Sequence, residues 1–182
     1  MLNIITAPNP VLSQSAKQIP EVNLNILKLI EEMEETLLTA KDPQGVGLAA
    51  PQIDKSLQIF LAKPTPKSST LVFINPKIVS SINAPIQNTK YKIQNTKLEG
   101  CLSLPNIWGE VNRLPQITLS YMDTRGASHK RTFKGFIATI IQHETDHLNG
   151  ILFPKRVLEQ KGKLYKSRKN KKGEDVFEEI EL

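Results

Sequence analysis

The residues with the clearest chemistry are two histidines and a glutamate in the segment His143-Glu144-Thr145-Asp146-His147. On a helix, the four-residue spacing places both imidazoles on one face, where they can bind one metal ion. Glu144 then lies where its carboxylate can accept a proton from a metal-bound water. The alternative is two ordinary surface histidines, but chance produces this motif only on the order of once per few hundred proteins. The spacing therefore predicts a hydrolytic metal site.

A catalytic metal also needs a third protein ligand beside an open position for water. One class of metalloprotease uses a histidine six residues after the second histidine, but Phe153 occupies that position here. A second class uses a more distant glutamate, and Glu159 or Glu174 could serve, although both lie in or beyond a basic segment without a helical pattern. Cys101, the single cysteine, is the better candidate. Its alternative role is that of a small buried hydrophobic residue.

A run of small residues at 45–52 adds a further element upstream of Cys101. Its two glycines allow the backbone to approach a ligand closely, and the Gln52 amide can donate an N–H to a developing oxyanion. Taken alone, the run is equally compatible with a tight turn between a helix and a strand. It lacks the Lys-Ser/Thr ending of a phosphate-binding loop, so a nucleotide site is not expected.

Two helices and several strands are predicted to position these residues. Apolar side chains recur at spacings of three and four over 25–41 and again over 135–149, where Gly150 is placed as a C-terminal cap. Strand-like runs occur at 57–62, 71–75, 117–122 and 128–133. The third histidine, His129, lies in the last of these runs and is interpreted as facing solvent.

Length and composition limit the remaining possibilities. A chain of 182 residues with 39% hydrophobic content is long enough for one buried core and favours a single domain over 1–182. No secretory signal begins the sequence and no apolar run reaches membrane length, so we expect a cytoplasmic protein without membrane contact. The single cysteine fits a reducing compartment.

Two segments differ from the rest of the chain. Residues 82–97 contain a short polar duplication and are predicted to form a surface insertion without assigned function. Residues 155–182 are predicted to form a basic C-terminal extension, whose part 155–172 carries nine Lys and Arg residues against the single acid Glu159. In a chain of net charge +6, this part is either a solvated surface or a site that contacts the phosphates of ribosomal RNA.

Three motifs, taken in order, resemble those of the peptide deformylase family. They are Gly-Val-Gly-Leu-Ala-Ala-Pro-Gln at 45–52, Glu-Gly-Cys-Leu-Ser at 99–103 and Gln-His-Glu-Thr-Asp-His-Leu-Asn-Gly at 142–150. The resemblance implies an α+β fold in which a mixed or antiparallel sheet packs around a central metal-binding helix. It also implies that Cys101, His143 and His147 bind one divalent metal, Fe(II) in the cell, with zinc or nickel possible in the isolated protein.

The resemblance further implies a hydrolase that removes the N-formyl group from the N-terminal methionine of nascent polypeptides. Glu144 would move the proton, while the Gln52 side chain and the backbone N–H of Leu102 would hold the oxyanion. The residues expected to contact the peptide backbone are Val46, Gly47 and Gly100, and Arg113 would meet the peptide farther along. Phe136 and Ile140 would form, with Val46, an apolar slot for the methionine side chain. Simple core packing is the alternative for Phe136 and Ile140.

Three positions depart from the pattern of the family. Ser13, Asn106 and Thr139 stand where arginine, glycine and arginine are frequent, which affects loop geometry and rate more than the type of reaction.

Two other classes of protein share the metal motif or the basic segment: an H-E-x-x-H metallopeptidase or zinc amidase, and a non-catalytic RNA-binding protein with a structural metal. Formyl release from formyl-Met-Ala, with and without a chelator, distinguishes the three.

Overall fold

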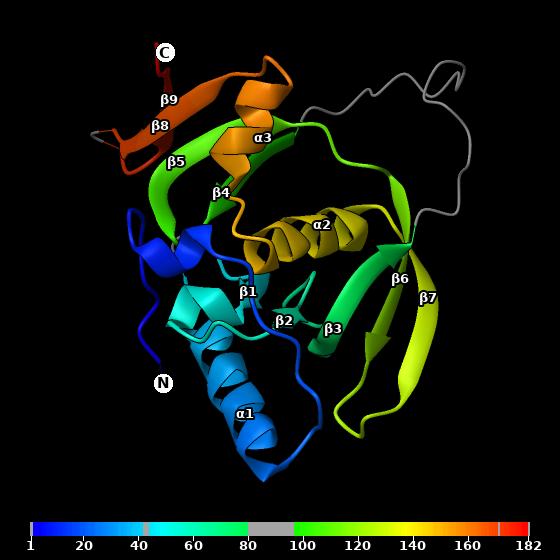
Figure 1. Ribbon diagram of the computed structural model, residues 1–182. Helices are drawn as coiled ribbons and strands as arrows, with labels where there is room; N and C mark the ends of the chain where they lie inside the picture. Colours follow the sequence, from blue (N-terminus) through cyan, green and yellow to red (C-terminus); the bar gives the residue numbers. More distant parts are fainter. Residues whose placement is uncertain (1, 42–43, 80–96, 171, 182) are drawn as a thin grey trace, which may run out of the picture.

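The computed structural model describes residues 2–41, 44–79, 97–170 and 172–181. Over these residues two antiparallel sheets and three α-helices form the structure (Figure 1). The helices are α1 (Leu24–Thr39), α2 (Phe136–Leu148) and α3 (Phe153–Glu159), with short 3-10 helices η1 (Pro10–Ser13) and η2 (Ala50–Ile53). The insertion predicted at 82–97 lies outside the described residues apart from its last position, where β4 begins.

The first sheet has the strand order β1-β2-β3-β6-β7, and the second has the order β4-β5-β8-β9. The first comprises β1 (Gly47–Ala49), β2 (Ile59–Ala62), β3 (Leu71–Val79), β6 (Gln116–Met122) and β7 (Ser128–Lys134). The second comprises β4 (Lys97–Cys101), β5 (Leu104–Val111), β8 (Leu164–Lys169) and β9 (Asp175–Glu179). Every strand pairing within these sheets is antiparallel, and α2 lies between them in Figure 1, which confirms the expected α+β arrangement.

Helices cover both faces of the five-stranded sheet, which explains why β2 is apolar throughout. Successive side chains of a strand point to opposite faces. Phe60 belongs to the apolar cluster that includes buried residues of α2, whereas Ile59 and Leu61 belong to the cluster that includes buried residues of α1. A strand buried on both faces cannot show the alternating pattern of a half-exposed strand.

The elements predicted from periodicity are present with shifted ends. The helix expected at 25–41 is α1, which begins after Asn23, whose side chain accepts hydrogen bonds from the next turn. The strand expected at 117–122 is β6, with Ile117, Leu119 and Tyr121 buried as predicted. His129 on β7 is 35% exposed and bonds Asp123 at 2.8 Å, so it faces solvent only in part.

The basic segment is not an appended tail. Phe153, Val157 and Leu164 are buried in an apolar cluster between α3 and the four-stranded sheet. In addition, β8 pairs with β5 on one side and with β9 on the other. The sequence-based interpretation treated this segment as a surface extension because its high charge hid its two apolar anchors, Val157 and Leu164, which pack with Phe153 directly before it.

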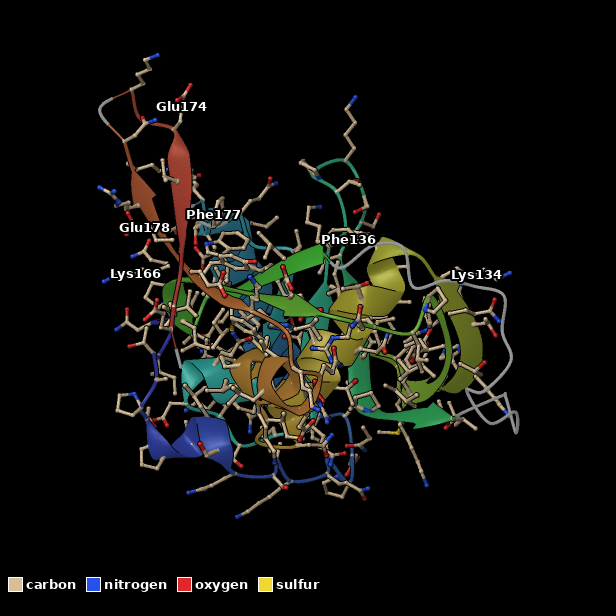
Figure 2. The ribbon with its side chains drawn as sticks, turned by 90° about the horizontal axis from the view of Figure 1, so that it is seen from above. Lys134, Phe136, Lys166, Glu174, Phe177 and Glu178 are labelled. Atoms are coloured by element: carbon tan, nitrogen blue, oxygen red, sulfur yellow. The ribbon has the colours of Figure 1, made fainter. Side chains whose placement is uncertain are left out.

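The acids that balance this charge follow it in the chain. Residues 174–181 hold Glu174, Asp175, Glu178, Glu179 and Glu181. Ion pairs join Lys163 to Glu179 at 2.8 Å, Arg168 to Glu178 at 2.7 Å and Lys169 to Asp175 at 2.7 Å, across or beside the β8–β9 hairpin. Figure 2 shows Lys166, Phe177 and Glu178 on the two strands of this hairpin, with Glu174 at its turn. The net positive surface expected from 155–172 is therefore much reduced.

Within the described residues, no helix has the length and apolar character needed to cross a bilayer.

Candidate metal centre

Cys101, His143 and His147 come together where the end of β4 meets α2. Their ligand atoms all lie within 4.8 Å of one another, and Cys101 Sγ is 3.1 Å from Nε2 of His147. The two histidine rings lie 4.9 Å apart, because four residues are little more than one helical turn. One thiol and two imidazoles in this arrangement can hold one divalent ion and leave a fourth position open.

The chain makes a sharp turn directly after the second histidine. Gly150 has φ +68°, its N–H donates to the carbonyl of His147 at 3.1 Å, and the N–H of Ile151 donates to the carbonyl of Asp146 at 2.9 Å. These two bonds form a Schellman motif, which confirms the predicted glycine cap. Gly150 is also required for packing, because a Cβ there would lie 2.6 Å from the backbone of Ser13.

Glu99 determines which nitrogen of His143 can reach a metal. Its Oε2 lies 3.0 Å from Nδ1 of His143. Burial alone would raise the pKa of Glu99, but hydrogen bonds from His143 and Arg113 outweigh it and lower the pKa to about 2. The ionised carboxylate can only accept, so Nδ1 of His143 carries the proton and Nε2 is left for the metal.

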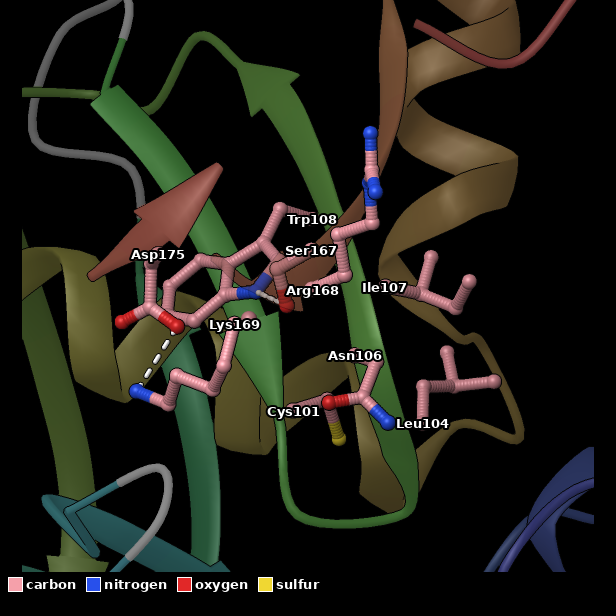
Figure 3. A pocket seen from close by; sticks show the side chains of 10 residues that line it. Cys101, Leu104, Asn106, Ile107, Trp108, Ser167, Arg168, Lys169 and Asp175 are labelled. Carbon is pink, nitrogen blue, oxygen red and sulfur yellow. Dashed lines mark hydrogen bonds and ion pairs between the residues drawn. The ribbon is translucent and has the colours of Figure 1, made fainter. Parts of the chain in front are cut away.

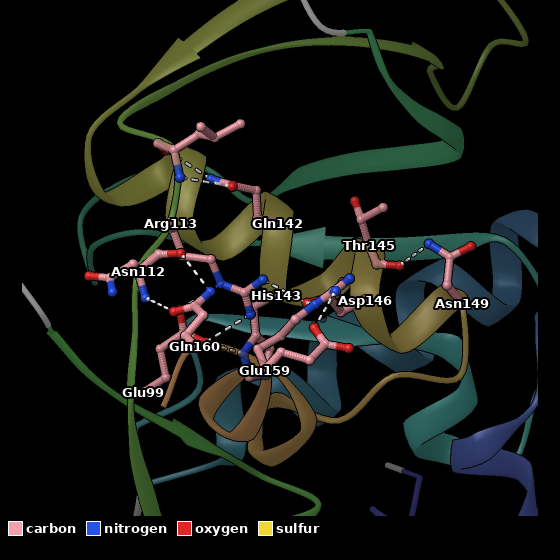
Figure 4. A network of polar contacts seen from close by, with 12 residues as sticks. Glu99, Asn112, Arg113, Gln142, His143, Thr145, Asp146, Asn149, Glu159 and Gln160 are labelled. Atoms are coloured by element: carbon pink, nitrogen blue, oxygen red, sulfur yellow. Dashed lines mark hydrogen bonds and ion pairs between the residues drawn. The ribbon is translucent and has the colours of Figure 1, made fainter. Parts of the chain in front are cut away.

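Arg113, which was expected to meet the peptide farther along, is buried and positions the Glu99 carboxylate. Its Nε and Nη2 donate to the two oxygens of Glu99 at 2.9 and 3.0 Å, and Nη1 donates to Asp146 at 2.6 Å (Figure 4). The side chain is 9% exposed. A buried guanidinium needs these partners, because an unpaired buried charge is costly. Arg113 therefore acts on His143 through Glu99.

The same network extends to α3 and explains the position of Glu159. Asp146 accepts hydrogen bonds from Nη2 and Nε of Arg156 at 2.7 and 3.1 Å, and Arg156 also donates to Glu159 at 3.0 Å. Glu174 accepts from Asn170 at the β8–β9 turn. In the described part of the chain, the group of closely spaced ligand atoms contains neither glutamate. The glutamate-ligand alternative is therefore wrong.

Glu144 lies buried next to the ligands with one oxygen free. It is 4% exposed, and among the described residues Oε2 has no hydrogen-bond partner. Burial raises the pKa of Glu144 to about 7. A glycine on β1 makes room for this side chain, since a Cβ on Gly47 would lie 2.1 Å from Glu144 Oε1. A buried carboxylate with a free oxygen, beside a Cys-His-His set, fits a catalytic divalent metal with a water.

The Gln52 side chain has a determined orientation. Its Oε1 accepts the backbone N–H of Ala49 at 2.8 Å, so the amide nitrogen must point the other way. That nitrogen lies 3.5 Å from Cys101 Sγ and donates to Ser103 Oγ at 3.2 Å. Gln52 is 1% exposed and Ser103 is fully buried. The expected N–H donor therefore faces the metal ligands.

The residues expected to contact the peptide occupy different environments. Gly47 on β1 and Gly100 on β4 belong to the terminal strands of their sheets. The carbonyl of Val46 accepts the N–H of Lys63 at 2.7 Å, which turns this carbonyl toward the end of β2. Ile140 is 3% exposed and packs in the core, whereas Phe136 at the start of α2 is 44% exposed.

Sequence reasoning missed Glu99, Ser103 and Asp146 as parts of this site. One signal was present for Glu99, because residues two apart on a strand point to the same side and Glu99 is two residues before Cys101. Asp146 lies inside the His-Glu motif as a second acid on a largely apolar helix, which indicates a buried partner. Arg113 and Arg156 are separated from it by 33 and 10 residues, so no local pattern identifies them.

Comparison with known proteins adds an independent observation. The family model described as polypeptide deformylase matches residues 1–163. The chain belongs to this family. A protein named peptide deformylase from Pelotomaculum thermopropionicum is 39% identical over 150 residues, which cover 82% of this chain and 87% of the relative. Another from Desulfotalea psychrophila is 35% identical over 175 residues, covering 94% and 96%.

Solved structures of the family agree with the fold. The crystal structure of peptide deformylase from Thermotoga maritima has a TM-score of 0.74 and 34% identity, covering 86% of this chain and 97% of that one. The Synechococcus elongatus deformylase, solved in complex with actinonin, has a TM-score of 0.73 and 33% identity, covering 86% and 78%. The match of the family model ends at Lys163, directly before β8.

Proposed function

We propose that this chain acts as a peptide deformylase, which hydrolyses the N-formyl group of formylmethionine at the N-terminus of nascent polypeptides. The observation that carries the proposal is the Cys101, His143 and His147 set beside the buried Glu144, whose Oε2 has no hydrogen-bond partner among the described residues, in a chain of this family. Formyl release from formyl-Met-Ala, lost with a chelator and restored by a divalent metal, is the expected result. A metal-loaded protein that cleaves unformylated peptides instead would overturn it.

The free edges of the two sheets support a binding mode for the peptide backbone. β1 and β4 each end their sheet, and Gln52, just after β1, lies 3.5 Å from Cys101 at the end of β4. An extended peptide placed between the two edges can pair with both. Because the carbonyl of Val46 already bonds Lys63, alternation in an antiparallel pair turns the carbonyl of Gly47 to the free edge. Gly47 and Gly100 are the proposed backbone partners.

The methionine side chain would then point toward α2. Ile140 and Val46 both pack in or against the apolar cluster below that helix, and Phe136 is partly exposed at the helix start. We assign Val46 and Ile140 to the wall of the methionine slot and Phe136 to its rim. Replacing formylmethionine by formylglycine in the substrate should lower kcat/KM strongly, since burial of the apolar side chain is lost.

Proton transfer and oxyanion binding fall to different residues of the site. A bound divalent ion supplies the Lewis acidity that activates water near neutral pH and polarises the formyl carbonyl. Glu144 accepts a proton as water adds to the formyl carbon, and it returns the proton to the amine nitrogen as the C–N bond breaks. Gln52 and the backbone N–H of Leu102 donate to the developing oxyanion. The products are formate and a free amino terminus.

We propose Fe(II) as the ion in the cell. A thiolate and two imidazoles accept several divalent ions, and zinc and nickel bind such donors more tightly than iron does. Protein isolated in air is therefore expected to carry zinc or nickel, because oxygen can attack both Fe(II) and the thiolate of Cys101. Metal content and formyl release, measured on the same samples after anaerobic reconstitution with each ion, test this. Equal turnover with zinc and Fe(II) would refute it.

We also propose a contact with the ribosome in the cytoplasm. The ion pairs of the structure reduce the number of cations that could make this contact. Of the cations in 155–172, Arg156, Lys163, Arg168 and Lys169 already have acidic partners. Within the described residues, the candidates for phosphate contact are Lys155, Lys161, Lys166 and Lys172. Neutralising these four should weaken cosedimentation with ribosomes and reduce its salt dependence. Unchanged cosedimentation across salt would leave this region a solvated surface.

A further inference from the structure

The four-stranded sheet has one face that packs on α3 and one that does not. Gly109 on β5 faces α3, because a Cβ there would meet the side chains of Val157 and Phe153 at 2.6 and 2.8 Å. Neighbouring residues of a strand point to opposite faces. Trp108 therefore faces away from α3, and so does Gly100, which is its partner across β4 and β5.

An open pocket of about 100 Å³ lies on this second face (Figure 3). Gly100, Cys101 and Asn106 come from β4 and β5 at one side of it, and Trp108 forms a large part of its wall. The opposite wall comes from the β8–β9 hairpin, where Lys169 and Asp175 form an ion pair at 2.7 Å. This hairpin lies after the residues that the family model matches.

The hairpin holds the Trp108 ring in place. The indole N–H donates to Ser167 Oγ on β8 at 3.1 Å. Phe177 on β9 meets the ring edge to face, with centroids 5.7 Å apart at 87°. The ring extends over Gly100, where a Cβ would lie 2.9 Å from its nearest atom. A glycine in β4 thus lets the tryptophan reach the free edge of the sheet.

A peptide on that edge must place one side chain against this pocket. This step rests on the proposed function, in which an extended substrate pairs with β4. Side chains of an extended peptide alternate between the two faces of a sheet. With the methionine directed toward α2, the residue that follows it points to the opposite face, where Trp108 and the pocket lie.

We propose that this pocket receives the side chain of the second residue of the substrate and that Trp108 makes the chain favour aromatic or large aliphatic residues there. An aromatic side chain gains attraction from the indole ring beyond simple burial, whereas glycine gains nothing. The Lys169–Asp175 pair borders the pocket, so a charged side chain would compete with an existing ion pair. The β8–β9 hairpin is thereby a specificity element of the active site.

The test compares formyl release from formyl-Met-Phe-Ser, formyl-Met-Leu-Ser and formyl-Met-Gly-Ser. For the unmodified protein, kcat/KM with phenylalanine should exceed that with glycine by about fivefold or more. Trp108→Ala should reduce this ratio below about twofold. Phe177→Ala removes only a 41% exposed ring and should reduce the ratio partly, so the proposal remains testable if the tryptophan variant folds poorly.

Val176→Ala is the matched control. Val176 adjoins Phe177 on β9, is similarly exposed at 36%, and points to the opposite face, so rates and ratios should not change. A ratio near one in the unmodified protein, or a ratio that survives both Trp108→Ala and Phe177→Ala, would overturn the proposal while formyl-Met-Gly-Ser is still hydrolysed. Absence of formyl release from every peptide by metal-loaded protein would instead overturn the proposed function, and this inference with it.

Discussion

Adding a single methyl group to Gly47 should disable the active site without touching a metal ligand. A Cβ at this position would lie 2.1 Å from Glu144 Oε1, and ordinary contact begins at 3.4 Å, so the carboxylate must move by about 1.3 Å. A misplacement of about 1 Å can cost on the order of 100-fold in rate, because proton transfer requires close alignment. We expect Gly47→Ala to lower kcat by roughly that factor while the bound metal content stays unchanged.

The stability of the same variant can be calculated in outline. Overpacking of a filled site costs about 1 to 3 kcal/mol in the free energy of unfolding. Replacing glycine by alanine also restricts the unfolded chain, which offsets up to about 1 kcal/mol. A net loss of about 1 to 2 kcal/mol is therefore expected, measured by urea denaturation of metal-loaded protein.

A double-mutant cycle isolates the cause, because Gly47 is also a proposed partner of the peptide backbone. In a Glu144→Ala background the added methyl has no carboxylate to displace, so the loss of stability from Gly47→Ala should disappear. If Gly47→Ala costs the same unfolding free energy in both backgrounds, the methyl acts on something other than Glu144. Unchanged kcat in Gly47→Ala would refute the reasoning directly.

Three further outcomes are expected. Glu144→Ala should keep the metal and lose about four orders of magnitude in turnover. Its free energy of unfolding should not fall, because the substitution removes a buried oxygen that has no partner among the described residues. Substantial activity of the metal-loaded variant would contradict the role of Glu144 in proton transfer. Cys101→Ser should bind divalent metal more weakly by equilibrium titration, since a charged soft donor becomes a neutral hard one, and full occupancy would exclude Cys101 as a ligand. Asp123 has its pKa lowered to about 2, chiefly by the hydrogen bond from His129; its contribution to stability is present above the unfolded value of 3.8 and is lost as pH falls toward 2. Asp123→Asn should therefore flatten the loss of unfolding free energy between pH 4 and 2, and an unchanged acid limb would refute the assignment.

The chemistry of this protein was accessible from sequence because it depends on short spacings. Two histidines four apart, with a glutamate between them, specify a ligand pair on any helix, whatever the rest of the fold. Amphipathic periodicity likewise identified α1, α2 and the alternating strand β6, since each buries one face. Gly150 could be placed as a cap because a left-handed residue after a helix favours glycine.

Other parts of the site depend on contacts between residues distant in sequence. Arg113 was assigned to the peptide, but its two carboxylate partners, Glu99 and Asp146, come from a strand and a helix that meet only in the folded chain. Charge alone does not show whether an arginine faces a substrate or another side chain. The role of Gly47 was visible only in part, because its closeness to Glu144 depends on how β1 packs on α2.

The C-terminal segment shows the same division most clearly. Its sequence shows many cations and predicts a solvated surface or an RNA contact. The tertiary structure pairs four of these cations with acids and buries two apolar residues among them, Val157 and Leu164. Sequence by itself identified the histidine pair with its glutamate, because that motif depends on residue type and local spacing, whereas Cys101 and the reaction class came from the resemblance to a family. Only the folded chain decided which charges are neutralised, which edges are free and which ring lies beside the site, because these depend on the long-range pairing of strands.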